Sequence, residues 1–217
     1  MQLLRGDGRV LRIGHRGVEH DVDCVELDVI GGLVVAHSRA EAHGAPHLDV
    51  ELERLAARGL AVQIDAKEHG LAAEIAAALA RHGLERRSFV STPSRRILRE
   101  FAQAAPSLPR SLSYPEDRLR LSTRAGAAPI VRSGLTAARV TLPLRLPRLV
   151  RSVRASAVTL DHRVVTRQSI DVCHRLGVAV IAWTVNERAL ATSLVQSGID
   201  AIITDDPRIV LAGIPTT

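Results

Sequence analysis

Seven residues with chemically useful side chains fall where apparent β-strands end: His15, Glu26, Asp28, Asp65, Lys67, Trp183 and Asp205. Because side chains alternate along a strand, Glu26 and Asp28 share one face of their strand, and Asp65 and Lys67 share one face of another. Two strands therefore direct three carboxylates and an ammonium group toward a common centre. Crowded carboxylates repel each other unless a cation lies between them, and Mg²⁺ and Ca²⁺ prefer such oxygen ligands.

Lys67 is the only lysine of the chain, whereas 28 residues are arginine. A lysine offers a compact point charge, and an arginine offers a wide planar fork of donors. The use of lysine at this single position indicates that an ammonium group is needed there.

Strand-like and helix-like segments alternate along the chain. The predicted strands are 9–14, 24–30, 33–37, 60–67, 88–92, 108–114, 155–160, 178–185 and 200–206, with 33–37 an extended arm of the strand before it. The predicted helices are 48–59, 70–83, 94–105, 167–177 and 187–198. Residues 116–154 form a less regular region, broken by Pro129, Pro143 and Pro147. About eight buried strands alternating with helices predict one α/β domain over residues 1–217, a closed (β/α)8 TIM-type barrel whose strand ends meet at one face.

The first crossover of this barrel is short. Only Val18 to Asp23 separate Gly17 from the strand at Cys24, whereas a helical crossover takes about a dozen residues. We therefore expect a barrel that lacks its first outer helix. The apolar flank left uncovered would include Val10, Ile13, Val25 and Val29, and we expect it to be covered either by a second copy of the chain in a homodimer or by a neighbouring helix shifted over it.

The net charge of +6 comes from one segment. Residues 116–154 hold nine arginines against Glu116 and Asp117, a balance of +7, and the rest of the chain balances to −1. This segment is suited to peripheral contact with an anionic membrane. The scarcity of aromatic residues argues against nucleic acid as a partner.

The sequence indicates a cytoplasmic location. The N-terminal residues lack the apolar run of a signal peptide, and no segment reaches the roughly 20 apolar residues of a membrane span. The two cysteines, Cys24 and Cys173, lie in apolar contexts and are expected to be reduced core thiols.

Several motifs carry a family resemblance. They are GHRG at 14–17, VELDV at 25–29, LVVAHS at 33–38, IDAK at 64–67, AWTVN at 182–186 and GIDAIITDDP at 198–207. In this order they resemble the glycerophosphodiester phosphodiesterase family over about residues 11–208, with a weak match at 110–154. The resemblance implies a barrel that uses two histidines and one divalent cation, Mg²⁺ or Ca²⁺, to cleave small glycerophosphodiesters to glycerol 3-phosphate and an alcohol.

The resemblance also assigns roles to individual residues. It implies His15 and His37 as the acid–base pair, Glu26, Asp28 and Asp65 as metal ligands, Arg16 and Lys67 on the phosphate, and Trp183 as a wall of the substrate pocket. The physical chemistry agrees, since cations offset the charge that builds on a phosphodiester during attack and imidazoles exchange protons near neutral pH. Two questions stay open at this point: which histidine is the base, and whether the attacker is water or a neighbouring hydroxyl of the substrate.

The sequence departs from the family pattern at the third metal ligand. Relatives usually have Glu where this chain has Asp65, whereas the related sphingomyelinase D toxins use Asp. Two alternatives to the hydrolysis of small glycerophosphodiesters therefore stay open. One is a lysophospholipase D or sphingomyelinase D-like lipid phosphodiesterase, and the other is an inactive barrel that binds phosphorylated ligands.

Overall fold

The computed structural model describes residues 10–15, 22–115 and 128–208, with only the backbone given for residues 128–132. The strands are β1 (Leu11–His15), β2 (Cys24–Ile30), β3 (Val34–Val35), β4 (Ala61–Ala66), β5 (Ser88–Thr92), β6 (Arg110–Tyr114), β7 (Ala157–Asp161), β8 (Ala179–Trp183) and β9 (Ala201–Thr204). The α-helices are α1 (Leu48–Ala57), α2 (Ala72–Arg81), α3 (Arg95–Ala104), α4 (Ala128–Val153), α5 (Arg167–Arg175) and α6 (Arg188–Gln196). The expected alternation of strands and helices is confirmed.

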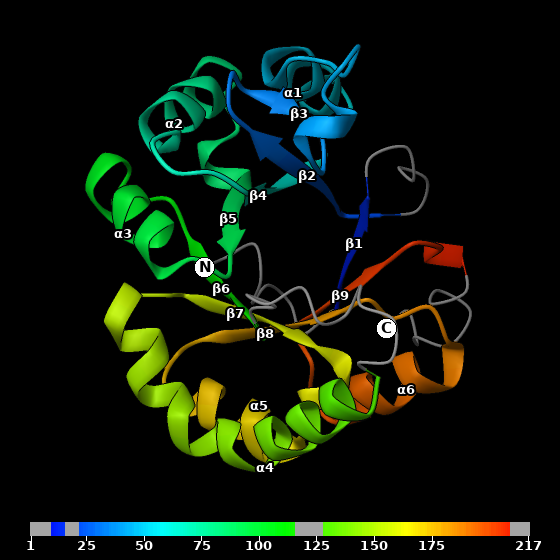
Figure 1. The fold of residues 1–217 in the computed structure, drawn as a ribbon. Helices are drawn as coiled ribbons and strands as arrows, with labels where there is room; N and C mark the ends of the chain where they lie inside the picture. Colours follow the sequence, from blue (N-terminus) through cyan, green and yellow to red (C-terminus); the bar gives the residue numbers. More distant parts are fainter. Residues whose placement is uncertain (1–9, 16–21, 116–127, 209–217) are drawn as a thin grey trace.

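Eight of the described strands form a closed parallel barrel (Figure 1). The strand order is β1-β9-β8-β7-β6-β5-β4-β2, and β1 closes the ring because it also pairs with β2. The short β3 is an antiparallel arm on β2, with Val29 opposite Val35. The TIM-type barrel predicted from the sequence is therefore correct.

The outer helices start at side-chain caps and cover the strands with apolar faces. Ser94 accepts a hydrogen bond from the Ile97 N–H at the start of α3, and Thr166 and Ser169 form a capping box at the start of α5. Apolar residues of α1, α2 and α3 form one cluster with the outer faces of β2, β4 and β5. Inside the barrel a separate cluster contains Ile13, Phe89 and Ile203. The core thus has an inner and an outer layer, as expected for this fold.

The predicted apolar flank on β1 and β2 is not exposed. Val10, Ile13, Val25 and Val29 are all buried within the single chain, which agrees with the second alternative, a neighbouring helix over the flank. Val25 and Val29 lie in the outer cluster with residues of α1, because a helix that follows β2 covers the same flank. Ile13 points into the barrel. A homodimer therefore stays a prediction that has lost its apolar basis.

The prediction of a missing outer helix concerns the segment between β1 and β2. Residues 16–21 of this segment lie outside the described residues.

The Arg-rich region is more regular than the sequence suggests. α4 is one helix of 26 residues that contains Pro143 and Pro147, each of which removes a backbone donor. Its inner face is held by Leu142, Leu146 and Val150, all buried against β7, β8 and their neighbours. Packing on this face therefore outweighs the helix-breaking tendency of proline. Among the described helices, none has the length and apolar character that crossing a bilayer requires.

The outer layer of the core offers a test of the fold. Leu52 on α1 is fully buried in the cluster that covers β2 and β4, and Val50 on the same helix is mostly exposed. We expect Leu52→Ala to lower the free energy of unfolding by about 2–5 kcal/mol. Val50→Ala, the matched control, should change it by less than about 0.5 kcal/mol. Urea denaturation measures both, and equal losses in the two variants would contradict the assigned packing.

Candidate active site

A cavity of about 610 Å³ opens at the carboxyl ends of the barrel strands. Seven of the eight residues implicated by the sequence line it: His15, Glu26, Asp28, His37, Asp65, Lys67 and Trp183. The eighth, Arg16, lies outside the described residues. The barrel thus brings together side chains that are up to 168 positions apart along the chain, from 15 to 183.

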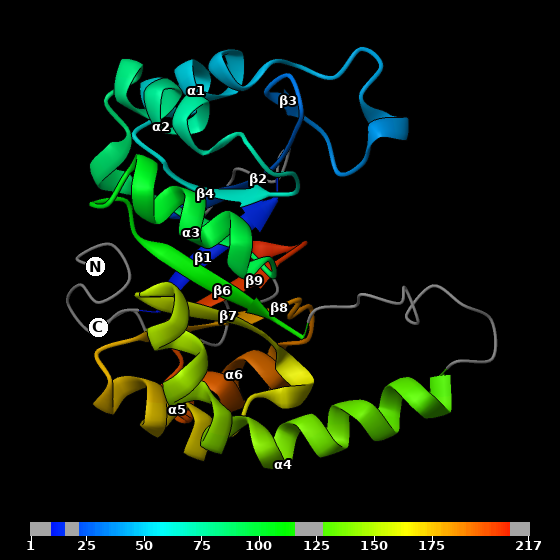
Figure 2. The same cartoon turned by 60° about the vertical axis from the view of Figure 1, so that its left-hand side comes forward.

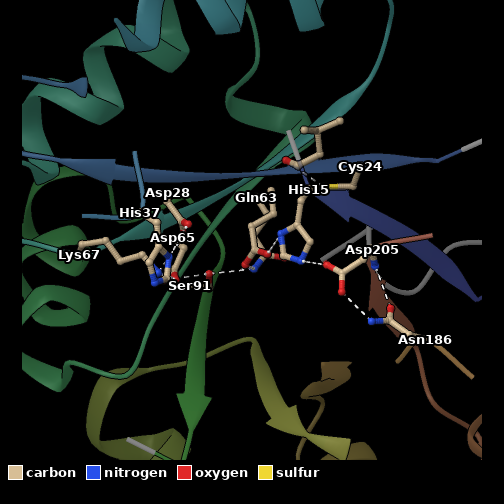
Figure 3. Close-up of polar contacts among 12 residues, drawn as sticks. His15, Cys24, Asp28, His37, Gln63, Asp65, Lys67, Ser91, Asn186 and Asp205 are labelled. Carbon is tan, nitrogen blue, oxygen red and sulfur yellow. Dashed lines mark hydrogen bonds and ion pairs between the residues drawn. The ribbon is translucent and has the colours of Figure 1, made fainter. Parts of the chain in front are cut away.

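His15 is held between two carboxylates, one from a neighbouring strand and one from the loop after β9. The strand register sets His15 beside Glu26, whose Oε2 lies 2.9 Å from the His15 Nδ1. On the other side of the ring, Nε2 lies 3.2 Å from Oδ1 of Asp205 (Figure 3). The hydrogen bond to Glu26 raises the pKa of His15 above its ordinary value and outweighs the opposing effect of burial. The imidazole is therefore well placed to hold and exchange a proton.

His37 reaches the cavity from the β3 arm rather than from a barrel strand. Its Nδ1 lies 2.9 Å from Oδ2 of Asp28, which fixes the ring while leaving the side chain 69% exposed. The arm is attached to the barrel by Glu68, which pairs with Arg39 at 2.8 Å and accepts a hydrogen bond from the Gly31 N–H at 3.1 Å. The second imidazole thus stands at the solvent side of the site.

Lys67 joins two of the carboxylates. Its Nζ lies 2.8 Å from Oδ1 of Asp28 and also contacts Oδ2 of Asp65. Burial alone would lower the pKa of Lys67, but the negative charges of Asp65 and Asp28 raise it, so the ammonium form persists. The lone lysine is therefore a fixed positive charge inside the cavity.

The carboxylates repel one another in spite of this ammonium group. Burial, together with the nearby charges of Glu26 and Asp28, raises the pKa of Asp65 to about 6, and Lys67 offsets only part of this effect. For Asp28, burial acts in the same direction, but Lys67 and His37 outweigh it and lower its pKa. The site holds more negative charge than one ammonium group neutralises.

Gln63 belongs to the site although the sequence analysis did not identify it. It is fully buried on β4, and its Nε2 donates to Oε1 of Glu26 at 2.6 Å and to Oγ of Ser91 at 3.0 Å. Its own Oε1 has no hydrogen-bond partner among the described residues. The available signal was strand alternation, because Gln63 lies two positions before Asp65 and faces the same way.

The loops after β8 and β9 complete the rim. Trp183 donates from Nε1 to the Thr159 carbonyl at 3.2 Å, which holds its ring against the cavity. Asn186 donates to Oδ2 of Asp205 at 2.6 Å, and its Oδ1 accepts from the Asp205 N–H at 3.0 Å. Asn186 stands just before Glu187, the N-cap residue of α6. Asn186 orients the carboxylate that faces His15.

The three carboxylates are suitable ligands for a hard cation, although Lys67 already pairs with two of them. Glu26, Asp28 and Asp65 line one cavity, where burial and the charges of the other two carboxylates raise the pKa of Asp65, so additional positive charge would favour its ionised form. Within the described ranges, no three His, Cys, Asp or Glu side chains are arranged to hold a metal ion. A cation bound by these carboxylates would therefore require the Lys67 ammonium group to move away from Asp28 and Asp65.

A second depression, of about 540 Å³, adjoins the main cavity. It shares His15, Glu26, Asp28 and His37 with the main cavity. Its remaining wall is built by the β3 arm and the loop that follows, with Val35, Ala36, Glu41, His43, Gly44, Ala45 and Pro46. The two histidines and two of the carboxylates thus border both spaces.

The barrel is similar to several solved structures. A candidate glycerophosphoryl diester phosphodiesterase from Silicibacter pomeroyi DSS-3 superposes with a TM-score of 0.70 at 20% identity, covering 97% of this chain and 96% of that one. A glycerophosphodiester phosphodiesterase from Parabacteroides distasonis gives 0.69 at 17% identity, covering 92% and 94%. A phosphodiesterase from Oleispira antarctica, solved with the product sn-glycerol-3-phosphate, gives 0.67 at 16% identity, covering 94% and 96%. At such identities the likeness establishes the fold.

The sequence comparison gives the family. No curated protein sequence matches the chain. The profile of the glycerophosphoryl diester phosphodiesterase family matches residues 41–209, well over half of the chain, with Asp65, Lys67 and Trp183 inside the match and His15, Glu26, Asp28 and His37 before it. Since the barrel places those four residues beside the matched ones, both halves of the site are present in one molecule. The chain therefore belongs to the glycerophosphoryl diester phosphodiesterase family of hydrolases.

Proposed function

We propose that the protein hydrolyses glycerophosphodiesters to glycerol 3-phosphate and an alcohol, with His15 and His37 as the acid–base pair. The observation that carries this proposal is the meeting of two cavities on a shared set of groups: His15, Glu26, Asp28 and His37. A phosphodiester has two alcohol arms on one phosphorus. With the phosphate at the shared groups, one arm fits the main cavity and the other fits the depression beside the β3 arm.

The charges of the site suit attack on phosphorus. Lys67 supplies a fixed ammonium group, and Arg16, predicted from the sequence, would add a second cation at the phosphate. One imidazole takes a proton from the attacking group, which is either water or a neighbouring hydroxyl of the substrate. The other imidazole protonates the oxygen that leaves as the alcohol. Asp28 and Glu26 hold His37 and His15 at one ring nitrogen each, which fixes the orientation of both rings.

Members of this family generally depend on divalent metal ions, and the three carboxylates fit such an ion. We propose that Glu26, Asp28 and Asp65 hold one Mg²⁺ or Ca²⁺. When bound, the ion would polarise the phosphoryl oxygens and offset their growing charge. Lys67, released from the carboxylates, would then be free to contact the phosphate.

The direct test is release of glycerol 3-phosphate from purified protein. Glycerophosphocholine, glycerophosphoethanolamine and glycerophosphoglycerol are offered with Mg²⁺ or Ca²⁺, and the product is followed with a glycerol 3-phosphate dehydrogenase. We expect turnover of at least one substrate. Binding of these compounds without any turnover under either metal would favour the inactive phospholigand-binding barrel instead.

The exposed face of α4 favours a second candidate function, cleavage of lysolipids at the anionic cytoplasmic surface of a membrane. Val140 is 71% exposed and Leu144 is 81% exposed, one helical turn apart. Arg148 continues the same stripe, and residues 128–154 contain no acidic residue. Figure 2 shows the first turns of α4 extending beyond the barrel on the side where the strands end. The helix could thus bring the cavity to the lipid surface.

Liposome flotation tests this membrane contact. We expect the protein to float with phosphatidylserine vesicles at low salt and to remain in the soluble fraction with phosphatidylcholine vesicles. Replacing Val140 and Leu144 together with Asp should lower the bound fraction at least about tenfold, because apolar burial and charge attraction are both weakened. Val50→Asp is the matched control, an exposed valine on α1. Equal loss in the control, or no binding by the wild type, would refute the contact.

A further inference from the structure

A third cavity, of about 280 Å³, adjoins the active-site cavity on the side of β5 and β6. It shares Pro93, Ser113 and Pro115 with the main cavity, so the two spaces meet along a common wall. Its other lining residues are Arg95, Leu112, Tyr114, Arg145 and Leu149. The third cavity touches neither the histidines nor the carboxylates of the site, and the proposed hydrolysis of a simple diester does not require it.

The charge of this cavity is opposite to that of the main one. Arg95 at the start of α3 and Arg145 on α4 contribute two guanidinium groups, and none of the described carboxylates lines the space. In the described part of the chain, neither arginine pairs with an acidic side chain. Arg95 and Arg96 also begin α3 without any acidic residue in its first turn, a position at which cations are disfavoured by the helix dipole. A bound anion would relieve both the unpaired charge and the dipole.

Hydroxyl groups add neutral donors to these cations. Arg145 donates from Nη1 to the Tyr114 Oη at 3.2 Å, and its guanidinium carbon lies 5.8 Å from the centroid of the Tyr114 ring. This contact fixes the guanidinium while most of its N–H groups remain available, because arginine has five. The Tyr114 hydroxyl accepts this bond and keeps its own proton to donate. Ser113 brings another hydroxyl to the wall that both cavities share.

We propose that this cavity is an anion subsite for a second phosphoryl group on the substrate. The preferred substrate class would then be a glycerophosphodiester whose alcohol itself carries a phosphate. Its diester phosphorus lies at the two histidines, and its terminal phosphate lies between Arg95 and Arg145. This inference rests on the proposed function and narrows its substrate class. Guanidinium groups suit a terminal phosphate because they bind its oxygens through paired, charge-assisted hydrogen bonds.

The test compares two substrates that differ only in the second phosphate, glycerophosphoinositol and glycerophosphoinositol 4-phosphate. The measured quantity is the ratio of their kcat/KM values. We expect the wild type to favour the phosphorylated substrate, and the Arg95→Gln, Arg145→Gln double variant to lose at least about tenfold of this ratio. Arg99→Gln with Arg151→Gln is the matched control, since it removes one exposed arginine from each of the same helices outside the cavity. The control should keep the wild-type ratio.

Two other outcomes would overturn the subsite. The ratio could be the same in the wild type and the double variant while both substrates are cleaved, in which case the proposed function stands and the subsite fails. Alternatively, the arginine substitutions could weaken inhibition by inorganic phosphate without changing the ratio, which would assign the cavity to free phosphate. If neither substrate is cleaved, the proposed function fails, and calorimetric binding of the same pair decides the subsite: tighter binding of the phosphorylated compound that is lost in the double variant supports it, and equal binding refutes it.

Discussion

His15→Ala is expected to lower kcat for glycerophosphodiester cleavage by at least about 100-fold, the usual contribution of a positioned acid or base. The side chain is held at both ring nitrogens by Glu26 and Asp205, so no neighbouring group can take its place without moving. His37→Ala should have an effect of similar size. Glycerol 3-phosphate release at saturating substrate measures both, with circular dichroism to verify folding.

A histidine outside the cavity provides the control for this pair. His174 lies 2.8 Å from a carboxylate, Asp200, but lines no part of the site. His174→Ala should leave kcat unchanged. A substrate with a nitrophenol leaving group separates the two roles, because that leaving group departs without a proton. The variant that lacks the acid should recover activity on this substrate, and the variant that lacks the base should not. Full activity of the His15→Ala variant would show that His15 has no role in the mechanism.

Removal of divalent metal should abolish turnover, and Mg²⁺ or Ca²⁺ should stabilise the fold. The reason is the meeting of Glu26, Asp28 and Asp65 in one cavity, where burial and the charges of the other two carboxylates raise the pKa of Asp65 to about 6. An ion at 100 times its dissociation constant would add about 2.7 kcal/mol to the free energy of unfolding. For a chain of this size that corresponds to a rise in Tm of roughly 5–10 °C.

Asp65→Asn keeps the shape of the side chain and removes one charged ligand. We expect this variant to need an at least about tenfold higher metal concentration for the same rise in Tm, and we expect its turnover to fall as well. Asp49, which pairs with Arg81 outside the cavity, supplies the control Asp49→Asn, whose response to metal should match that of the wild type. Differential scanning fluorimetry with and without EDTA measures the shift independently of catalysis. A wild type whose Tm and activity ignore both EDTA and metal would exclude the carboxylates as a metal site.

The sequence predicted the barrel and most of the cavity because the site follows strand geometry. Glu26 and Asp28, or Asp65 and Lys67, face the same way for a reason that depends only on alternation, and parallel strands bring their ends to one face. The same rule would have identified Gln63, but an uncharged side chain in an apolar run gives little reason to single it out. Whether the eight residues act as assigned is a matter for the experiments above.

Two features depended on packing that local sequence does not reveal. Val25 and Val29 look exposed if the helix before their strand is missing, yet α1, which follows the strand, covers them. Residues 128–153 look broken because Pro143 and Pro147 oppose helix formation locally. Leu142, Leu146 and Val150 favour it through contacts with distant strands, and propensity is a weak guide once such burial is available.

The β3 arm carries one of the two proposed catalytic imidazoles, and the loop that follows it lies outside the buried core of the protein. Leu33 and Val35 anchor the arm in the outer cluster of the core, whereas none of residues 38–46 is buried. Changes between residues 38 and 46 can therefore reshape one side of the reaction space at little cost to folding. That division makes the arm a natural target for directed evolution of new substrate ranges, and a place where selection can alter chemistry while the scaffold persists.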